Sequence, residues 1–300
     1  EISLGLVGSE MCIRDRCYTT RKRMSRTEYY SLVAGLREYA LDADTKGFDA
    51  RAIIAEILEN VSRADARQVR LLYGYYDCEN LISLRNGRTA HNALGNFTRE
   101  ELEQQLRDPR RLPPLVARVI RAYADPEGED AEELDMNRPF EKTLMEAYYR
   151  QCDGAESRFL REWSLFDRTL RNVAAAVTAR AAGRPVEETV VGDGDVVEQL
   201  SRSSAADFGL RGELPYIDAV IAAVNDEANL LEKEHKIDLI RWNEAEELAT
   251  FDYFNINTIL SYLVRINIVA RWTRLDEKRG REMLGRLLAQ LDGKELINKQ

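Results

Sequence analysis

Histidine is scarce in this 300-residue chain, which contains only His91 and His235. Because general-base catalysis draws most often on histidine, this chemistry is poorly supplied. The sequence also lacks a Gly-x-Ser-x-Gly elbow, a paired cysteine and histidine signature and a dinucleotide-binding glycine fingerprint. These absences disfavour a serine hydrolase, a thiol protease and a Rossmann enzyme, so we expect neither catalysis nor a bound cofactor.

The first residues of this sequence are a poor match to a secretory signal. Residues 1–16, "EISLGLVGSEMCIRDR", have neither a proper apolar segment nor a small-residue cleavage site. They resemble the translation of a sequencing adapter. We therefore expect residues 1–23 to be an artefact or a disordered leader, with the natural protein starting at Met24 or a few residues upstream.

Cysteine is also sparse, and Cys12 and Cys17 fall within the leader that we set aside. The two that remain, Cys78 and Cys152, provide neither a disulfide framework nor a zinc-binding spacing. Two unpaired cysteines without an export signal fit a reducing cytoplasm, which is where we expect the protein to be.

An excess of basic residues is lacking as well, since the formal net charge is -9. Broad contact with nucleic-acid phosphates would need clustered, uncompensated lysine and arginine. We therefore expect no nucleic-acid partner. Basic residues do outnumber acidic ones locally over residues 269–286. This pattern suits contact with an acidic protein surface or with lipid head groups, or an ordinary solvated helix face.

The most apolar stretch, residues 254–272, reads "FNINTILSYLVRINIVARW". On a helix it forms one apolar stripe, but Arg265 would lie near the middle of a membrane at a cost of about 2.5–3.5 kcal/mol. We therefore predict a helix packed on several sides inside a bundle, and no transmembrane segment.

The apolar spacing in the rest of the chain is helical and predicts an all-α fold. Six apolar residues between Phe159 and Val177 recur at steps of three and four, as on one face of a long helix. Thr98 and Glu101 form a capping box, and Pro113 and Pro114 suit the start of a helix ending near Ala124.

Two stretches without a stripe, residues 124–139 and 181–197, divide the helical pattern. They predict three helical modules, at 24–124, 138–182 and 194–300. The exception to the helical pattern is residues 28–36, "EYYSLVAGL", whose β-branched and aromatic content predicts one short strand.

An imperfect repeat runs through the three modules, in which an aromatic residue and aspartate are followed by asparagine. The alternative interpretation is that the three matches arise by chance, because the middle copy holds two extra residues before its asparagine. We expect aspartate to cap helices and asparagine to bond a neighbouring backbone. The candidate structural residues are Tyr76, Asp77 and Asn80; Phe166, Asp167 and Asn172; and Phe251, Asp252 and Asn255.

One spacing suggests a metal. Glu232 and His235 have the Glu-x-x-His spacing of di-iron bundles, but such sites use two copies, and Arg88 stands three positions before His91. We therefore predict no metal site. The glycine-rich "VVGDGDVV" at 190–197 lacks the residues of a phosphate or calcium loop and predicts a turn.

Four segments together carry a resemblance to a known family. They are "YYSLVAGL" (29–36), "YYDCENL" (75–81), "EWSLFDRTLRNVAAAVTAR" (162–180) and "FNINTILSYLVRINIVARWTRLDEKRG" (254–280). In their order and combination they resemble a bacterial family that is encoded beside V-type (A-type-like) ATPase subunits. That family is similar to the rotor subunit known as C in archaeal and bacterial enzymes and as d in eukaryotic ones. Arg37 departs from the pattern, because proline is usual there.

The resemblance implies a helical protein of three similar domains that caps the membrane rotor ring on its cytoplasmic side and receives the foot of the central stalk. It thus implies a non-catalytic coupling subunit in the transport of protons or sodium ions, with stalk and ring subunits as partners. We single out four candidate contacts for those partners: Arg265, Arg271, Trp272 and Arg274. The alternatives are a free-standing helical adaptor and a helical metalloenzyme centred on Glu232 and His235.

Overall fold

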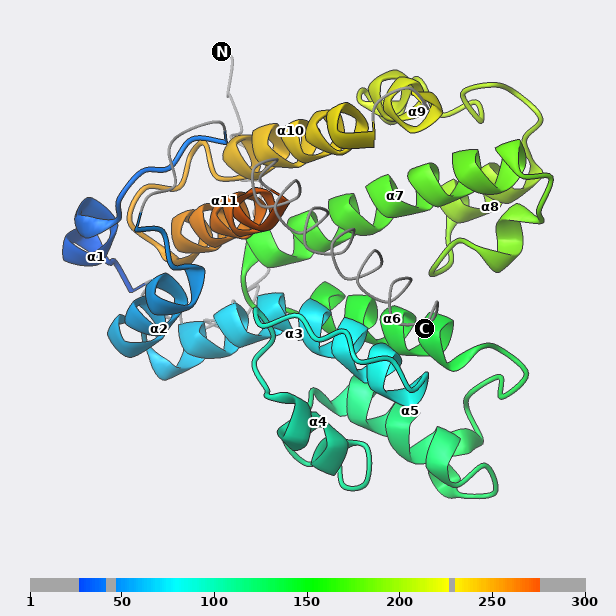
Figure 1. The fold of residues 1–300 in the computed structure, drawn as a ribbon, viewed down its shortest axis with the longest axis horizontal. Coiled ribbons are helices and arrows are strands. Elements are labelled where there is room, and N and C mark those ends of the chain that lie inside the picture. The colour runs from blue at the N-terminus through cyan, green and yellow to red at the C-terminus, as the bar shows by residue number, and fades with distance from the viewer. Residues whose placement is uncertain (1–26, 42–46, 227–229, 276–300) are drawn as a thin grey trace, which may run out of the picture.

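The computed structural model describes residues 27–41, 47–226 and 230–275, and over these ranges the chain is all-α. The described residues form eleven α-helices and two short 3₁₀ helices, and they contain no strand. Figure 1 shows the helices in chain order. The prediction of an all-α fold is confirmed.

The first six α-helices occupy the N-terminal half of the chain. Their bounds are α1 Tyr30–Gly35, α2 Ala50–Asn60, α3 Arg63–Arg85, α4 Arg99–Gln105, α5 Pro114–Ala124 and α6 Phe140–Asp153, with the 3₁₀ helix η1 at Glu129–Ala131. The other five are α7 Arg158–Ala181, α8 Asp195–Arg202, α9 Ile217–Asn225, α10 Leu230–Leu248 and α11 Ile256–Leu275, with η2 at Val186–Glu188.

Side chains close the N-terminal ends of several helices, where the first backbone N–H groups lack helical partners. The Asp49 carboxylate accepts from the N–H groups of residues 51 and 52 at the start of α2. The predicted capping box of Thr98 and Glu101 is confirmed at α4. Helix α5 begins at Pro114 and ends at Ala124, as predicted.

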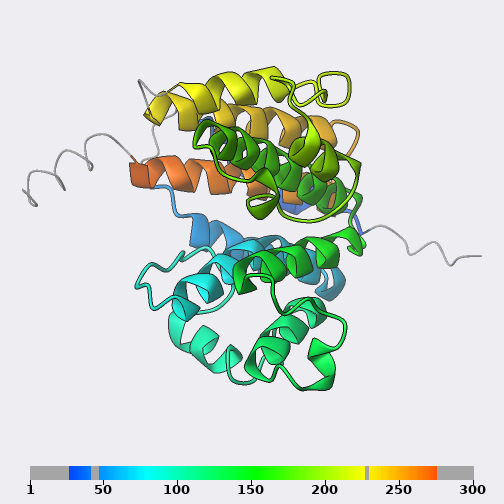
Figure 2. The ribbon, with the colours of Figure 1, turned by 90° about the vertical axis from the view of Figure 1, so that its right-hand side faces the viewer.

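The helices form two groups that meet along α3 (Figure 2). The upper group consists of α7–α11, which α1, α2 and the N-terminal half of α3 join in one hydrophobic core. The lower group has its own core, which the C-terminal half of α3 shares with α4, α5 and α6. These cores cross the predicted module boundaries, because α6 packs on α5 and α7 packs on α9. The division into modules 24–124, 138–182 and 194–300 stays a prediction.

Helix α11 explains the apolar stretch at 254–272. It contacts α2, α3, α7 and α10, and its apolar side chains are buried on nearly every side. Arg265 is only partly buried and pairs with Glu246 of α10 at 3.0 Å. The prediction of a helix packed on several sides is confirmed. None of the helices that the structure describes is long and apolar enough to cross a membrane.

The predicted strand at 28–36 is wrong, because residues Tyr30–Gly35 form the short helix α1. The Val33 N–H donates to the Tyr29 carbonyl at 2.9 Å, which closes a helical turn. A strand needs a neighbouring strand to take up its backbone groups, and the described residues supply none. The intrinsic preference of tyrosine and valine for strands therefore yields to local hydrogen bonding.

Candidate functional site

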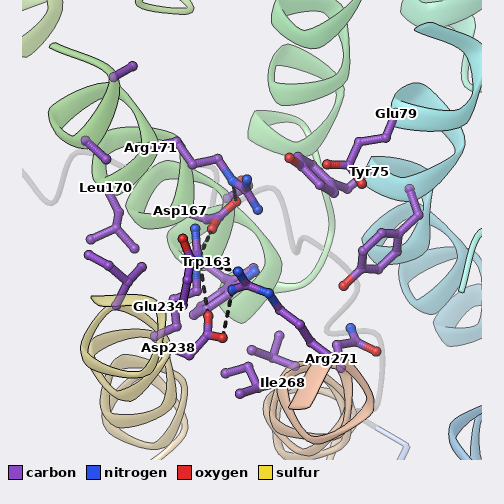
Figure 3. A pocket seen from close by; sticks show the side chains of 18 of the residues that line it. Tyr75, Glu79, Trp163, Asp167, Leu170, Arg171, Glu234, Asp238, Ile268 and Arg271 are labelled. Carbon is purple, nitrogen blue, oxygen red and sulfur yellow. Dashed lines mark hydrogen bonds and ion pairs between the residues drawn. The ribbon is translucent and has the colours of Figure 1, made fainter. Parts of the chain in front are cut away.

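A cavity of about 770 Å³ lies between the two groups of helices, and we call it the central cavity. Helices α3 and α6 line one side, and α7, α10 and α11 line the other. Figure 3 shows Tyr75 and Glu79 of α3 across the cavity from Asp238 and Arg271. Its walls combine tyrosine side chains with a dense set of charges, so it differs from the apolar cores beside it.

Six side chains form a continuous chain of ion pairs along one wall, which we call the ionic chain. It runs through Arg171, Asp167, Arg241, Asp238, Arg271 and Glu234. Asp167 accepts from Arg171 at 2.7 Å and from Arg241 at 3.0 Å. Asp238 accepts from Arg241 at 3.2 Å and from Arg271 at 2.8 Å. Since its members come from α7, α10 and α11, the ionic chain ties three helices together.

The two aspartates of the ionic chain are buried, at 6% exposure for Asp167 and 1% for Asp238. Burial alone would raise the pKa of Asp167, but the guanidinium groups of Arg171 and Arg241 outweigh it and hold the pKa below its ordinary value. Burial opposes the charge of Arg271 in the same way, and Asp238 and Glu234 outweigh it, so the pKa of Arg271 is raised. Asp167 and Arg271 are therefore charged at neutral pH.

Arg171 also links the two groups of helices. Its guanidinium carbon lies 4.4 Å from the centre of the Tyr75 ring, within the range of a cation–π contact. On the α6 side, the Tyr149 hydroxyl donates to Asp167 at 3.3 Å. Burial raises the pKa of both tyrosines, so they face the ionic chain as neutral phenols. Arg171 thus contacts side chains on both walls of the central cavity.

The lining of the central cavity is positive overall, although the chain as a whole is acidic. Six cationic side chains line it against four carboxylates, Glu79, Asp167, Glu234 and Asp238. Three of the cations lie outside the ionic chain: Arg184, Lys233 and Arg274. Lys233 donates to the Val224 carbonyl and Arg274 to the Ala270 carbonyl, and a neutral carbonyl leaves their charge in place. The cavity therefore suits a negatively charged group.

The first two copies of the predicted repeat place their asparagines alike. Asn80 donates to the Asn92 carbonyl at 2.9 Å and accepts from its N–H at 2.6 Å. Asn172 holds Val191 in the same manner, with both distances at 2.8 Å. The prediction that asparagine bonds a neighbouring backbone is confirmed at these two positions. Tyr76 of the first copy and Asp167 of the second both line the central cavity.

The third copy lies apart from the central cavity, in the loop between α10 and α11. Asn255 accepts from the N–H groups of Asn257 and Thr258, which closes the start of α11. Asp252 is buried and pairs with Arg158 at 2.7 Å. Phe251, however, is 87% exposed, whereas Phe166 of the second copy is buried. The structural role predicted for the three copies as one repeat stays a prediction.

The four candidate partner contacts fall on two faces of α11. Arg271 belongs to the ionic chain, and the Trp272 indole donates to Asp238 at 2.9 Å. Arg274 lines the central cavity and is exposed. Arg265 lies elsewhere, above the Trp242 ring at 5.5 Å. The structure thus brings Arg271 and Arg274 to the central cavity, and their contact with a partner stays a prediction.

The candidate metal ligands Glu232 and His235 both lie on α10. The His235 ring packs edge-on against Trp272, with ring centres 5.4 Å apart. Within the described ranges, no group of three or more histidine, cysteine, aspartate or glutamate side chains is arranged to hold a metal ion.

Sequence reasoning missed most of the ionic chain, namely Arg171, Arg241, Asp238 and Glu234. The sequence did contain a signal for these ion pairs. Asp167 and Arg171 are four residues apart, and Asp238 and Arg241 are three apart. Each pair therefore shares a helix face. Phe166 and Leu170 put the first pair beside the apolar stripe of α7, where charges are unusual. Opposite charges at helical spacing beside a buried stripe would have indicated an internal ion pair.

Asp77 of α3 is a buried carboxylate held by neutral hydrogen-bond donors. It accepts from the Asn96 amide at 2.6 Å and from the Phe97 N–H at 3.3 Å. Burial raises the pKa of Asp77 to about 6, and these hydrogen bonds only partly oppose the shift. The folded state thus takes up a proton near pH 5 that the unfolded state does not hold.

We expect this proton to make stability depend on pH. Because the folded pKa lies above the unfolded one, the contribution of Asp77 is full below about pH 4 and is lost as the pH rises through 6. Relative to Asp77→Asn, wild type should lose about 2 kcal/mol of unfolding free energy between pH 4 and pH 7. Urea unfolding at a series of pH values measures the difference.

The matched control for Asp77 is Asp130→Asn. A hydrogen bond from Arg121 lowers the pKa of Asp130. The difference in unfolding free energy between wild type and Asp130→Asn should therefore stay constant above pH 5. A difference between wild type and Asp77→Asn that is equally constant would show that Asp77 ionises normally in the folded protein.

The fold and the cavity together define an all-helical protein with a charged cavity between two groups of helices. The chain belongs to the family described as protein of unknown function (DUF2764), whose model matches residues 26–294. No curated protein matches the chain.

Proposed function

We propose that this protein is a non-catalytic central-rotor subunit of a V/A-type ATPase. In this role it couples the central stalk to the membrane ring during ATP-driven ion transport, and it lies on the cytoplasmic face of the membrane as a peripheral part of the complex. The observation that carries the proposal is the central cavity, which is positive within an acidic chain and open to a negatively charged part of a stalk subunit. The resemblance of four segments to a family encoded beside ATPase subunits supports the same role.

The ionic chain gives the central cavity the stiffness that a coupling protein needs. Helices α7, α10 and α11 are joined by ion pairs to the buried carboxylates of Asp167 and Asp238, and Arg171 extends the link to Tyr75 of α3. Buried charge pairs are costly to separate, because each partner would be left desolvated and unpaired. A load applied at the cavity wall is therefore passed to both groups of helices.

The proposal predicts stable association with a rotary ATPase. A tagged chain purified from its native host under mild detergent should recover stalk and ring subunits in constant ratio, as measured by quantitative mass spectrometry. Reversing two charges of the cavity in Lys233→Glu with Arg274→Glu should lower that recovery about 10-fold or more, because like charges are brought together.

The control for this experiment is Arg202→Glu on α8, a change of the same kind at an exposed residue outside the cavity lining. It should leave the recovery of subunits unchanged. Recovery of the chain as a free monomer, with an ATPase that assembles and turns over without it, would instead indicate a free-standing adaptor and overturn the proposal.

A further inference from the structure

Four aromatic side chains on α1 and on the loop between α10 and α11 are exposed. They are Tyr30 at 55%, Phe251 at 87%, Tyr253 at 67% and Phe254 at 38% exposure, and we call them the aromatic tip. Figure 1 shows α1 at the same end of the molecule as this loop. The rings of Tyr30 and Phe254 are 4.6 Å apart, so the residues of α1 and the loop form one surface. Exposed aromatic clusters of this kind are typical of interaction sites.

The loop that carries the aromatic tip is held in place from within. Asp252, between the two most exposed aromatics, is buried and accepts from Arg158 at 2.7 Å and from Asn255 at 2.6 Å. Arg158 also donates to the Leu248 carbonyl at 2.7 Å. Asp252 is anchored inward, and its neighbours Phe251 and Tyr253 are exposed.

The α1 side of the aromatic tip is anchored too. The Tyr29 N–H donates to the Phe254 carbonyl at 2.5 Å, and Tyr29 itself is buried. The Tyr29 hydroxyl accepts from the Ser62 N–H at 3.0 Å, which fixes this segment to the start of α3. Rigid aromatic side chains lose little conformational entropy on binding, and buried aromatics dominate the affinity of many interfaces.

The charges around the aromatic tip are mainly negative. Glu162 and Asp252 both pair with Arg158, and Glu246 is paired with Arg265. Among the residues that the structure describes, two further exposed carboxylates border the tip, Glu28 beside Tyr30 and Glu247 at the end of α10. The tip is thus an apolar surface with a negative rim.

We propose that the aromatic tip docks into an apolar groove of a partner protein whose rim carries lysine or arginine. The negative rim of the tip would repel an anionic bilayer and would also repel the same rim on a second copy of this chain. A basic groove complements both the rings and the carboxylates. The proposal does not rest on the proposed function, because it concerns a surface outside the central cavity and holds for a partner of any identity.

Site-specific photocrosslinking tests the proposal. A photoreactive benzoyl-phenylalanine is placed at position 251 or 253 of the full-length chain in its native host, and crosslinked peptides are identified by mass spectrometry. Both probes should mark one partner at apolar residues flanked by lysine or arginine. A probe at Leu165, an exposed apolar position on α7, is the control and should not give that product.

Binding of the purified chain to the purified partner then measures what the aromatic tip contributes. Phe251→Ser and Tyr253→Ser should each weaken affinity about 10- to 100-fold, and Glu247→Lys should weaken affinity and reduce its salt dependence. Tyr253→Phe keeps the ring and should bind within about 3-fold of wild type. Circular dichroism checks that each variant remains folded.

Three results would overturn the inference. They are crosslinks that form only between copies of this chain, flotation of the chain with neutral phosphatidylcholine vesicles in a manner that Phe251→Ser abolishes, and unchanged affinity in both serine variants. A partner that is not an ATPase subunit would count against the proposed function and leave this inference standing.

Discussion

Asp238→Ala should lower the unfolding free energy by about 3–5 kcal/mol, because it removes the acceptor at the centre of the ionic chain. Asp238 is 1% exposed and accepts from Arg241, Arg271 and the Trp272 indole. Without it, these three donors lose their shared partner, and the largely buried Arg241 keeps Asp167 alone as an ion-pair partner. Guanidinium chloride unfolding, followed by circular dichroism at neutral pH, measures the loss.

The control is Asp218→Ala, which removes an aspartate that also binds an arginine, Arg211, at 2.9 Å. That pair lies on the surface, where water replaces the lost partner, so the unfolding midpoint should stay within the error of the measurement. Equal destabilisation by the two variants would mean that burial of the ionic chain adds nothing to its energetics.

A replacement that keeps the shape of Asp238 separates charge from packing. Asp238→Asn retains one acceptor oxygen but places an amide N–H₂ against a guanidinium group, so part of the loss should remain. If Asp238→Asn were as stable as wild type, the negative charge would be unnecessary, and hydrogen bonding alone would explain the stability of this wall.

The helices of the fold could be predicted from the sequence because their signals are local. The steps of three and four from Phe159 to Val177 predicted α7, and the capping box at Thr98 predicted the start of α4. A stripe or a cap involves residues within one or two turns, so one segment carries all the information needed.

The central cavity could not be predicted in this way, because its parts are distant in the sequence. Arg241 of α10 meets Asp167 of α7, and Arg171 meets Tyr75 of α3, in contacts that depend on how whole helices pack. Charges at helical spacing indicate that a pair can form within a helix. They do not indicate which neighbouring helix completes it.

The positions of Phe251 and Phe166 show a similar limit. Both begin an aromatic-aspartate pair, yet Phe166 is buried within α7 and Phe251 is exposed in a loop. In each copy the aspartate is the buried, paired residue, at Asp167 and at Asp252. The same dipeptide therefore places its aromatic ring inside or outside according to whether the backbone around it is helix or turn.

The second large effect is expected at Phe159, which the apolar stripe already assigned to the core. Phe159 is fully buried, and its ring lies parallel to that of Trp163 with centres 6.2 Å apart. Phe159→Ala should lower the unfolding free energy by about 3–5 kcal/mol, because it removes buried surface and leaves a cavity that the surrounding helices only partly fill.

Leu165→Ala is the matched control, since Leu165 lies on the same helix but is 52% exposed. It removes a large apolar side chain that is half exposed, and it should change the unfolding free energy by no more than about 0.5 kcal/mol. Because alanine suits a helix at both positions, the difference between the two variants measures burial alone. A small loss of unfolding free energy for Phe159→Ala would mean that the start of α7 repacks freely. The stiffness assigned to the wall of the central cavity would then have to come from the ionic chain alone.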